Sequence, residues 1–169
     1  RLSAALNSMD KHALSQAKVY KAAESAVRVD SAMQDAIANW GTWVDKDANG
    51  VGQGEYYQFK ATMLDEIRSS VEMAGFMPGT QDYNMAVKTA QVGALTELHK
   101  QIVENMVADE RIPEANAYLN EALQNGEIDG ASYDVVANLV KTAGSKKQSI
   151  DLYNIIQGED QATQMAQAK

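Results

Sequence analysis

Residues 55–75 read EYYQFKATMLDEIRSSVEMAG, and this stretch decides the fold class. Its large apolar side chains recur at spacings of three and four, so they share one face of an α-helix. They are Tyr56, Phe59, Met63, Ile67 and Val71. Gly75 follows where helices commonly end in a left-handed residue. The stretch therefore predicts an amphipathic helix from about Glu55 to Ala74.

The composition of the whole chain agrees with this helix. Alanine, glutamine, methionine, glutamate and lysine are abundant, and proline occurs only at Pro78 and Pro113. These abundant residues lose little conformational entropy in a helix, whereas interior prolines would break one. Alternating β-branched runs, which mark strands, are missing. We predict an all-α fold, an elongated multi-helix array or bundle with a long N-terminal helix followed by helical hairpins.

The long N-terminal helix is predicted from Leu2 to Val44, a segment without proline and with a single glycine, Gly41. Its apolar positions, spaced mostly by three and four, are Leu6, Met9, Ala13, Ala17, Tyr20, Ala23, Val27, Met33, Ile37, Trp40 and Val44. A helix of about 40 residues would extend about 60 Å, more than the width of a small domain. Two interpretations stay open: the helix breaks near Asp30, or it packs against another chain.

Four more helices are predicted beyond residue 80. The first runs from Gln81 to Ala108, with Thr80 and Asp82 as suitable caps. Its apolar positions are Met85, Val92, Leu95, Leu98, Ile102 and Met106. The others are Glu114–Gln124 after an N1 proline at Pro113, a helix from Asp129-Gly130 to Gly144, and one from Ser145 or Ser149 to Gly158.

These elements make residues 1–169 a single helical region. It comprises a long helix at 1–44, a helical-hairpin region at 55–158 and a helix-prone tail at 159–169. Because the sequence begins with Arg1 and not methionine, we interpret it as a segment of a larger protein. No run of about 18 apolar residues occurs. Membrane contact is therefore expected only through other parts of the parent protein.

Charge and cysteine content exclude several classes of function. The 23 acidic and 15 basic residues leave a formal charge of −8, which argues against sequence-specific nucleic-acid binding. No cysteine is present, so disulfides, thiolate metal sites and a cysteine nucleophile are excluded.

The loop DKDANGVGQGEYY, residues 45–57, partly resembles a calcium-binding EF-hand loop. Asp45, Asp47, Asn49 and Gly50 match the first four requirements of that loop. Position 12, where a bidentate glutamate is needed, is Tyr56, and Glu55 comes one residue early. Asp, Asn and Gly are also what any turn between helices uses, so the pattern favours a turn over a metal site.

Other candidate chemical groups form no recognisable site. His12 and His99 stand alone on predicted helices, which favours a surface or packing role over metal binding. The acidic pairs Asp65-Glu66 and Asp109-Glu110 are typical of helix surfaces. We predict no catalytic, cofactor-binding or metal-binding residue, no cofactor and no enzymatic activity.

Aromatic residues and methionines are interpreted as packing groups. Trp40, Trp43, Tyr56 and Tyr57 flank the loop and are expected to form a cluster that closes the first helix against the second. Most of the eight methionines fall on the apolar stripes, so we expect them in the core. They include Met33, Met63, Met73, Met77, Met85 and Met106.

Residues 55–143, about half the chain, resemble the helical regions of internal virion proteins of short-tailed bacteriophages. The phrases that carry the resemblance are EYYQFKATMLDEIRSSVEMAG, LHKQIVENMVADER and IPEANAYLNEALQNGEIDGASYDVVANLV. They form a pattern of helix lengths and turn residues and contain no catalytic motif. The resemblance implies a helix-rich core or ejection protein that stacks as oligomeric rings above the portal.

From this resemblance we expect a structural, non-enzymatic virion component that forms a homo-oligomer and contacts other core or portal proteins. Its expected location is the virion interior and, after ejection, the host cell envelope, where such proteins help build a conduit for DNA. The alternative hypothesis is a helical ligand-binding or sensor module of a bacterial extracytoplasmic protein.

Overall fold

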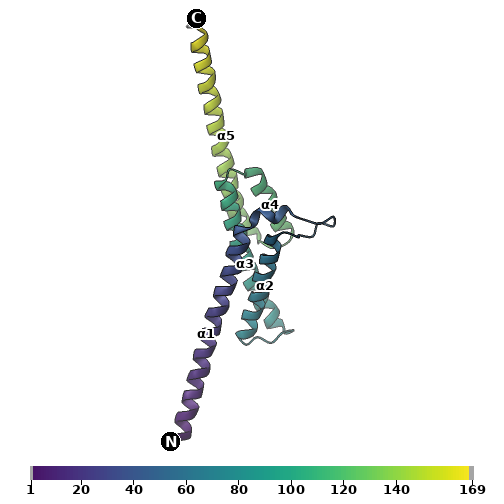
Figure 1. The fold of residues 1–169 in the computed structure, drawn as a ribbon, viewed down its shortest axis with the longest axis vertical. Helices are drawn as coiled ribbons and strands as arrows, with labels where there is room; N and C mark the ends of the chain where they lie inside the picture. Colours follow the sequence, from purple (N-terminus) through teal and green to yellow (C-terminus); the bar gives the residue numbers. More distant parts are fainter. Residues whose placement is uncertain (1, 168–169) are drawn as a thin grey trace. The chain divides into compact units, whose positions relative to one another are not determined.

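The computed structural model describes the backbone of residues 2–167 and the side chains of residues 12–17 and 19–155. This part of the chain is helical throughout, apart from turns and one isolated β-bridge between Lys46 and Gly52 (Figure 1). The predicted all-α fold is confirmed. The helices are α1 (Leu2–Ala38), the short 3₁₀ helix η1 (Trp40–Val44), α2 (Glu55–Met73), α3 (Gln81–Ala108), α4 (Ile112–Gln124) and α5 (Gly130–Gln167).

The chain divides into two compact units between Leu98 and His99, inside α3. Unit 1 comprises α1, η1, α2 and the first part of α3, up to Leu98. Unit 2 comprises the remainder of α3 together with α4 and α5. The single helical region expected from the sequence thus contains two units, each with its own buried core.

Helix α1 passes through Asp30 without a break and ends at Ala38, before the predicted Val44. Of the two interpretations left open, the break near Asp30 is therefore wrong, because this stretch contains neither proline nor glycine and the next turns carry the buried residues Ala32, Met33, Ala36 and Ile37. The end is set by Asn39, whose side-chain amide donates to the Asp35 carbonyl at 2.8 Å. The chain then tightens into η1, where the Thr42 amide donates to the Asn39 carbonyl at 3.0 Å.

The core of unit 1 lies between the last turns of α1 and one face of α2, which run side by side (Figure 1). The buried residues of α1 include Ala32, Met33, Ala36 and Ile37. Those of α2 are Tyr56, Met63, Ile67 and Val71. The face predicted for residues 55–75 is confirmed, with Phe59 half-buried at its edge.

A tight corner joins η1 to α2. Helix α2 lacks a side-chain cap of its own, and the Thr42 hydroxyl accepts a hydrogen bond from the Tyr56 amide at 2.9 Å. The Tyr57 hydroxyl donates to the Trp43 carbonyl at 2.7 Å, and Trp43 itself is buried. The two tyrosine rings meet edge to face, with centroids 5.0 Å apart. Of the predicted aromatic cluster, the ring contact between Tyr56 and Tyr57 is confirmed, and Trp43 takes part through its backbone carbonyl.

Three helices end in the same two-bond turn, in which a left-handed residue closes the helix. Gly75 and Gly126 occupy this position after α2 and α4, with φ angles of 99° and 68°. After α3 the position is taken by Glu110, with a φ of 58°. The Glu110 and Arg111 amides donate to the carbonyls of Val107 and Met106. A non-glycine residue thus adopts a left-handed conformation at the end of α3.

Helix α5 is longer than predicted. It continues through Gly144, where the sequence predicted an end, and through Gly158 to Gln167. A glycine inside a helix lowers the stability of the helix by only about 1 kcal/mol relative to alanine, so the helix can continue through it when the flanking residues favour helix. A Cβ built on Gly144 would lie 3.4 Å from the Cγ2 atom of Ile112. The residue at 144 therefore lies close against the start of α4.

Other boundaries agree with the prediction more closely. Helix α3 spans the predicted residues, and the Thr80 hydroxyl caps it by accepting from the Tyr83 amide at 3.2 Å. Helix α4 begins at Ile112, slightly before the predicted Glu114, with Pro113 in its first turn.

The methionine prediction is only partly correct. Met33, Met63 and Met106 are buried, whereas Met77 and Met85 are 72% and 61% exposed. Val87 takes the buried place on α3 that the pattern assigned to Met85.

The corner allows a steric test with a matched control. A Cβ at Gly54 would overlap the backbone and side chain of Thr42, whereas a Cβ at Gly41 would meet nothing within 4 Å. We expect Gly54→Ala to lower the free energy of unfolding by about 1–3 kcal/mol, since the corner must open to admit the methyl group. Gly41→Ala should leave it nearly unchanged. Urea unfolding of both variants measures the difference, and equal stabilities would contradict the packing described.

The cap of α5 predicts a pH dependence. Hydrogen bonds from the backbone amide and the hydroxyl of Ser132, each 2.9 Å long, hold the pKa of Asp129 below its usual range. A lowered folded-state pKa gives stability that is present above the unfolded pKa of about 4 and is lost as the pH falls through the folded value.

We therefore expect Asp129→Ala to lower the melting temperature at pH 7, with the difference from wild type shrinking below about pH 4. Asp129→Asn keeps a capping oxygen and should retain most of the stability at pH 7. Melting curves between pH 2.5 and 7 test both expectations. A wild-type to alanine difference that is unaffected by pH would show that the carboxylate charge plays no part.

Candidate functional site

The loop that resembled a calcium site folds as a turn stabilised by its own backbone. Oδ1 of Asp47 accepts hydrogen bonds from the amides of Asn49 and Val51, at 2.8 and 2.9 Å. Gly50 has a φ of 79°, and its amide donates to the Asp47 carbonyl at 2.9 Å. The Asp45 carbonyl accepts from the Gln53 amide at 2.8 Å. The residues that suggested metal ligands thus include an aspartate that shapes the turn.

The acidic pairs also lie in ordinary surface contacts. Asp65 pairs with Arg68 at 2.6 Å, and Glu66 lies 3.6 Å from Arg28 of α1. Glu110 accepts a hydrogen bond from Lys147 at 2.7 Å. Among the residues that the structure describes, no three His, Asp or Glu side chains come together in a way that could hold a metal ion.

The two histidines lie in different surroundings. His12 is exposed on α1, whereas His99 is 1% exposed in the core of unit 2. Nδ1 of His99 lies 2.8 Å from the Tyr118 hydroxyl, and Nε2 lies 3.0 Å from Oε2 of Glu127. The packing role suggested by the sequence holds for His99. Its partners were not predicted, because no local spacing links α3 to residues of α4 and the following turn.

The buried histidine joins three segments of unit 2. Tyr118 is 3% exposed and comes from α4, while Glu127 follows the left-handed Gly126 that ends α4. The Glu127 amide donates to the Ala122 carbonyl at 2.9 Å, which places this residue directly after the helix end. With hydrogen on Nε2, the imidazole accepts from Tyr118 and faces the Glu127 carboxylate. The hydrogen bond with Tyr118 thus ties α4 to α3, while Nε2 makes no hydrogen bond and lies next to the Glu127 carboxylate.

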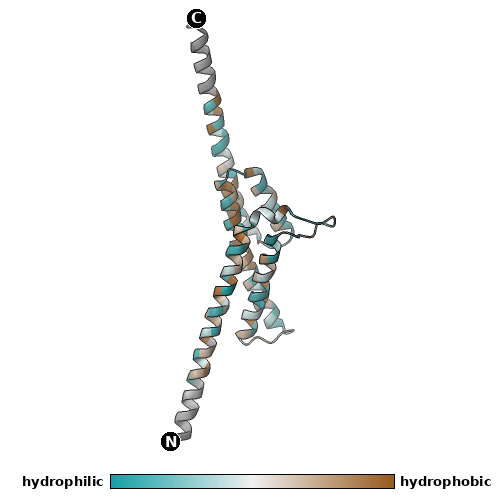
Figure 2. Cartoon of the chain, viewed as in Figure 1, coloured by the Kyte–Doolittle hydropathy of each residue, from teal (hydrophilic) through white to brown (hydrophobic). Residues whose placement is uncertain are grey.

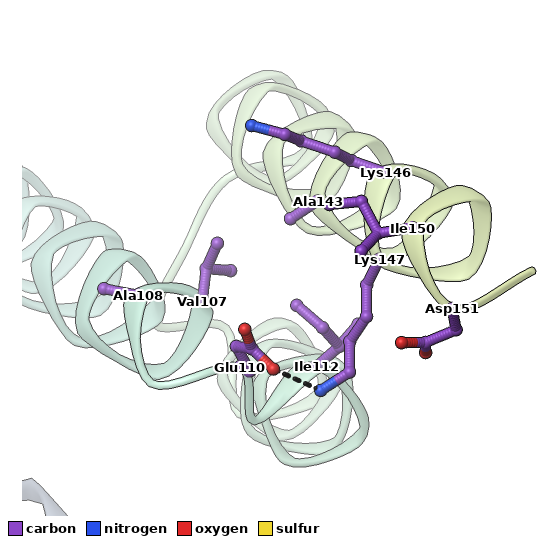
Figure 3. Close-up of a pocket in the computed structure, with 9 residues that line it drawn as sticks. All are labelled: Val107, Ala108, Glu110, Ile112, Ala143, Lys146, Lys147, Ile150 and Asp151. Carbon is purple, nitrogen blue, oxygen red and sulfur yellow. Dashed lines mark hydrogen bonds and ion pairs between the residues drawn. The ribbon is translucent and has the colours of Figure 1, made fainter. Parts of the chain in front are cut away.

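A cavity of about 360 Å³ lies in unit 2 where the end of α3 meets α5 (Figure 3). Its walls are apolar at Val107, Ile112 and Ile150, and its rim is charged. In Figure 3, Lys147 crosses the cavity toward Glu110, and their ion pair is marked by a dashed line. The same hydrogen bond raises the pKa of Lys147 and lowers that of Glu110. Of the four charged residues that line the cavity, Glu110 and Lys147 are therefore paired with each other, and Lys146 and Asp151 are the other two.

A second cavity, of about 340 Å³, lies in unit 1. Residues of α1, α2 and α3 line it, among them Met33, Ile67 and Ala90. Its lining is mainly apolar, with Asp30 and Ser70 as the polar members.

Exposed apolar side chains are concentrated on two helices. On α1 they are Leu14, Val19, Tyr20 and Val27, between 60% and 73% exposed. On α5 they are Val135, Leu139, Ile150, Leu152, Tyr153 and Ile155. Figure 2 shows hydrophobic residues recurring along the stretch of α1 that α2 does not accompany. Part of the apolar pattern predicted for residues 2–44 is therefore absent from the core of the chain. Such surfaces are typical of protein–protein contacts.

The histidine network gives a paired test. Tyr118→Phe removes the hydroxyl next to Nδ1 of the buried His99, and we expect a loss of about 1–3 kcal/mol in the free energy of unfolding of unit 2. Tyr133→Phe is the control, since its hydroxyl contacts Asn120 at 2.7 Å on the exposed surface. Its effect should stay within about 0.5 kcal/mol. Denaturant unfolding measures both, and a neutral Tyr118→Phe would contradict the proposed role of the hydroxyl.

Two further properties bear on the function. None of the helices that the structure describes has the length and the apolar character needed to cross a membrane. No protein-family model, curated protein or solved structure matches the chain.

Proposed function

We propose that the chain is a structural, non-enzymatic component of a phage virion, an internal core or ejection protein that works as a homo-oligomer. The observation that carries the proposal is the set of exposed apolar side chains on α1 and α5. A chain that leaves Tyr20, Val27, Tyr153 and Ile155 in water has surfaces suited to further copies or other core proteins.

The resemblance to internal virion proteins supports the same proposal. Its phrases coincide with α2, the second part of α3, and the hairpin formed by α4 and α5. Two turns that belong to these phrases, at Gly75 and Gly126, have a glycine with a positive φ angle. The resemblance therefore concerns helix lengths and the positions of turns, which is what a structural role requires.

In this role the protein resides inside the virion, against other core or portal proteins. After ejection it contributes to a conduit for DNA through the host envelope. With a formal charge of −8, the chain offers no overall attraction to the phosphate backbone. Contacts with protein, and not sequence-specific contacts with DNA, would hold it in place.

Peptide mass spectrometry of purified phage particles from the source tests the proposal. Trypsin releases the peptide Ile112–Lys141, which covers α4 and the start of α5. We expect this peptide at several copies per particle, at a constant ratio to the portal protein. As a control, particles treated with protease before lysis should retain the peptide, because the protein lies inside the capsid. Particles free of the peptide would refute the virion role.

A second candidate, a helical ligand-binding or sensor module, is favoured by the mainly apolar cavity of unit 1. The parent gene separates the two candidates. An extracytoplasmic sensor requires transmembrane segments flanking this region, and recovery of the peptide from host membranes in uninfected cells would favour it.

A further inference from the structure

Helix α1 has two faces with different surroundings. One face is covered by unit 1 itself, and its buried residues are Ser25, Ala32, Met33, Ala36 and Ile37. The other face is exposed along its described length, at Ala13, Gln16, Tyr20, Ala23 and Val27. Tyr20 is 73% exposed and Val27 69% exposed. We call these five residues the outer seam.

The outer seam has the spacing of a coiled coil. Its members are separated alternately by three and four residues, the repeat that keeps one stripe of a helix facing a partner helix. The sequence extends the same spacing back to Met9 and Leu6. Because the covered face lies on the other side of α1, a partner helix can reach the outer seam without displacing α2.

We propose that the outer seam binds the α1 helix of a second copy of this chain, in antiparallel orientation. The inference rests on the self-association that the proposed function includes, and it specifies the surface and the geometry.

Charge complementarity selects this occupant. Residues 12–22 contain Lys18 and Lys21 and no acidic residue, a net charge of +2 with histidine neutral. Residues 23–38 contain one basic residue, Arg28, and three acidic residues, Glu24, Asp30 and Asp35, so their net charge is 1 − 3 = −2. An antiparallel second copy places each basic half on an acidic half, whereas a parallel copy would place like charges together. The contact is then self-complementary, as a two-fold symmetric dimer requires.

The sizes of the side chains support the same orientation. In a parallel pair, Tyr20 would meet Tyr20 of the second copy in one layer, next to a layer of two alanines. With the two-fold axis between residues 21 and 22, Tyr20 instead faces Ala23 of the second copy. Large side chains then alternate with small ones, which fills the seam evenly. In the same register Gln16 faces Val27 of the second copy.

Cysteine cross-linking of the full chain tests the orientation, and the absence of native cysteine makes each introduced thiol unique. Chains carrying Gln16→Cys are mixed with differently tagged chains carrying Val27→Cys, then oxidised. We expect a disulfide-linked dimer containing one chain of each kind. Neither variant alone should cross-link, because identical residues lie about 16 Å apart along the antiparallel pair, beyond the reach of a disulfide.

Ala22→Cys is the control, an exposed position away from the outer seam that should cross-link with neither variant. Efficient cross-linking of either seam variant with itself would show a parallel pair and overturn the proposal. A chain that is monomeric by light scattering and gives no mixed disulfide would also overturn it.

These outcomes are separable from the proposed function. A peptide found in phage particles together with a negative cross-link would remove the antiparallel pair and leave the virion role. A positive cross-link in a chain that is absent from phage particles would remove the virion role and leave the antiparallel pair.

Discussion

The corner between α1 and α2 depends on one close approach, that of Gly54 to Thr42. Because residue 54 has no Cβ, the Thr42 hydroxyl comes close enough to accept a hydrogen bond from the Tyr56 amide. Thr42 therefore caps the start of α2 although it lies in η1. The same approach brings Tyr57 under the Trp43 carbonyl. These contacts set the direction in which α2 leaves the corner, and α2 then covers the last turns of α1. The part of α1 that α2 does not cover stays exposed to water and can contact another chain.

Unit 2 is held by a different kind of interaction, a polar group inside its core. His99 lies between Tyr118 and Glu127 and joins α3, α4 and the turn after α4. A buried polar residue is costly unless its partners are in place, so the hydrogen bond between His99 and Tyr118 favours one arrangement of α3 and α4. Gly126 makes this arrangement possible, since its left-handed conformation places Glu127 beside the end of α4. Glu110 adopts a similar conformation without being glycine, and its side chain pairs with Lys147 at the rim of the cavity.

The proposed role relies on surfaces and not on a reaction centre. Helices α1 and α5 both extend beyond the parts that their own units bury, and both carry large apolar side chains there. In a virion core such helices would find partners in neighbouring copies. The outer seam of α1 has the clearest pattern because its spacing, its side-chain sizes and its charge distribution all favour an antiparallel second copy. The apolar residues of α5 provide a further exposed surface, which the proposed role would assign to contacts with other core proteins.

The sequence by itself determined the helical fold and most helix boundaries. Apolar spacing located α2 and α3, and the turn residues Gly75 and Gly126 marked the ends of α2 and α4, because these signals act over a few neighbouring residues. The sequence wrongly predicted helix ends at Gly144 and Gly158. Whether a glycine ends a helix depends on how stable the helical turns on either side of it are. Periodicity also could not say which of the apolar residues of α1 are buried, because a stripe looks the same against an internal or an external partner. The tertiary structure alone decided that division and the partners of His99, because both depend on contacts between residues far apart in the chain.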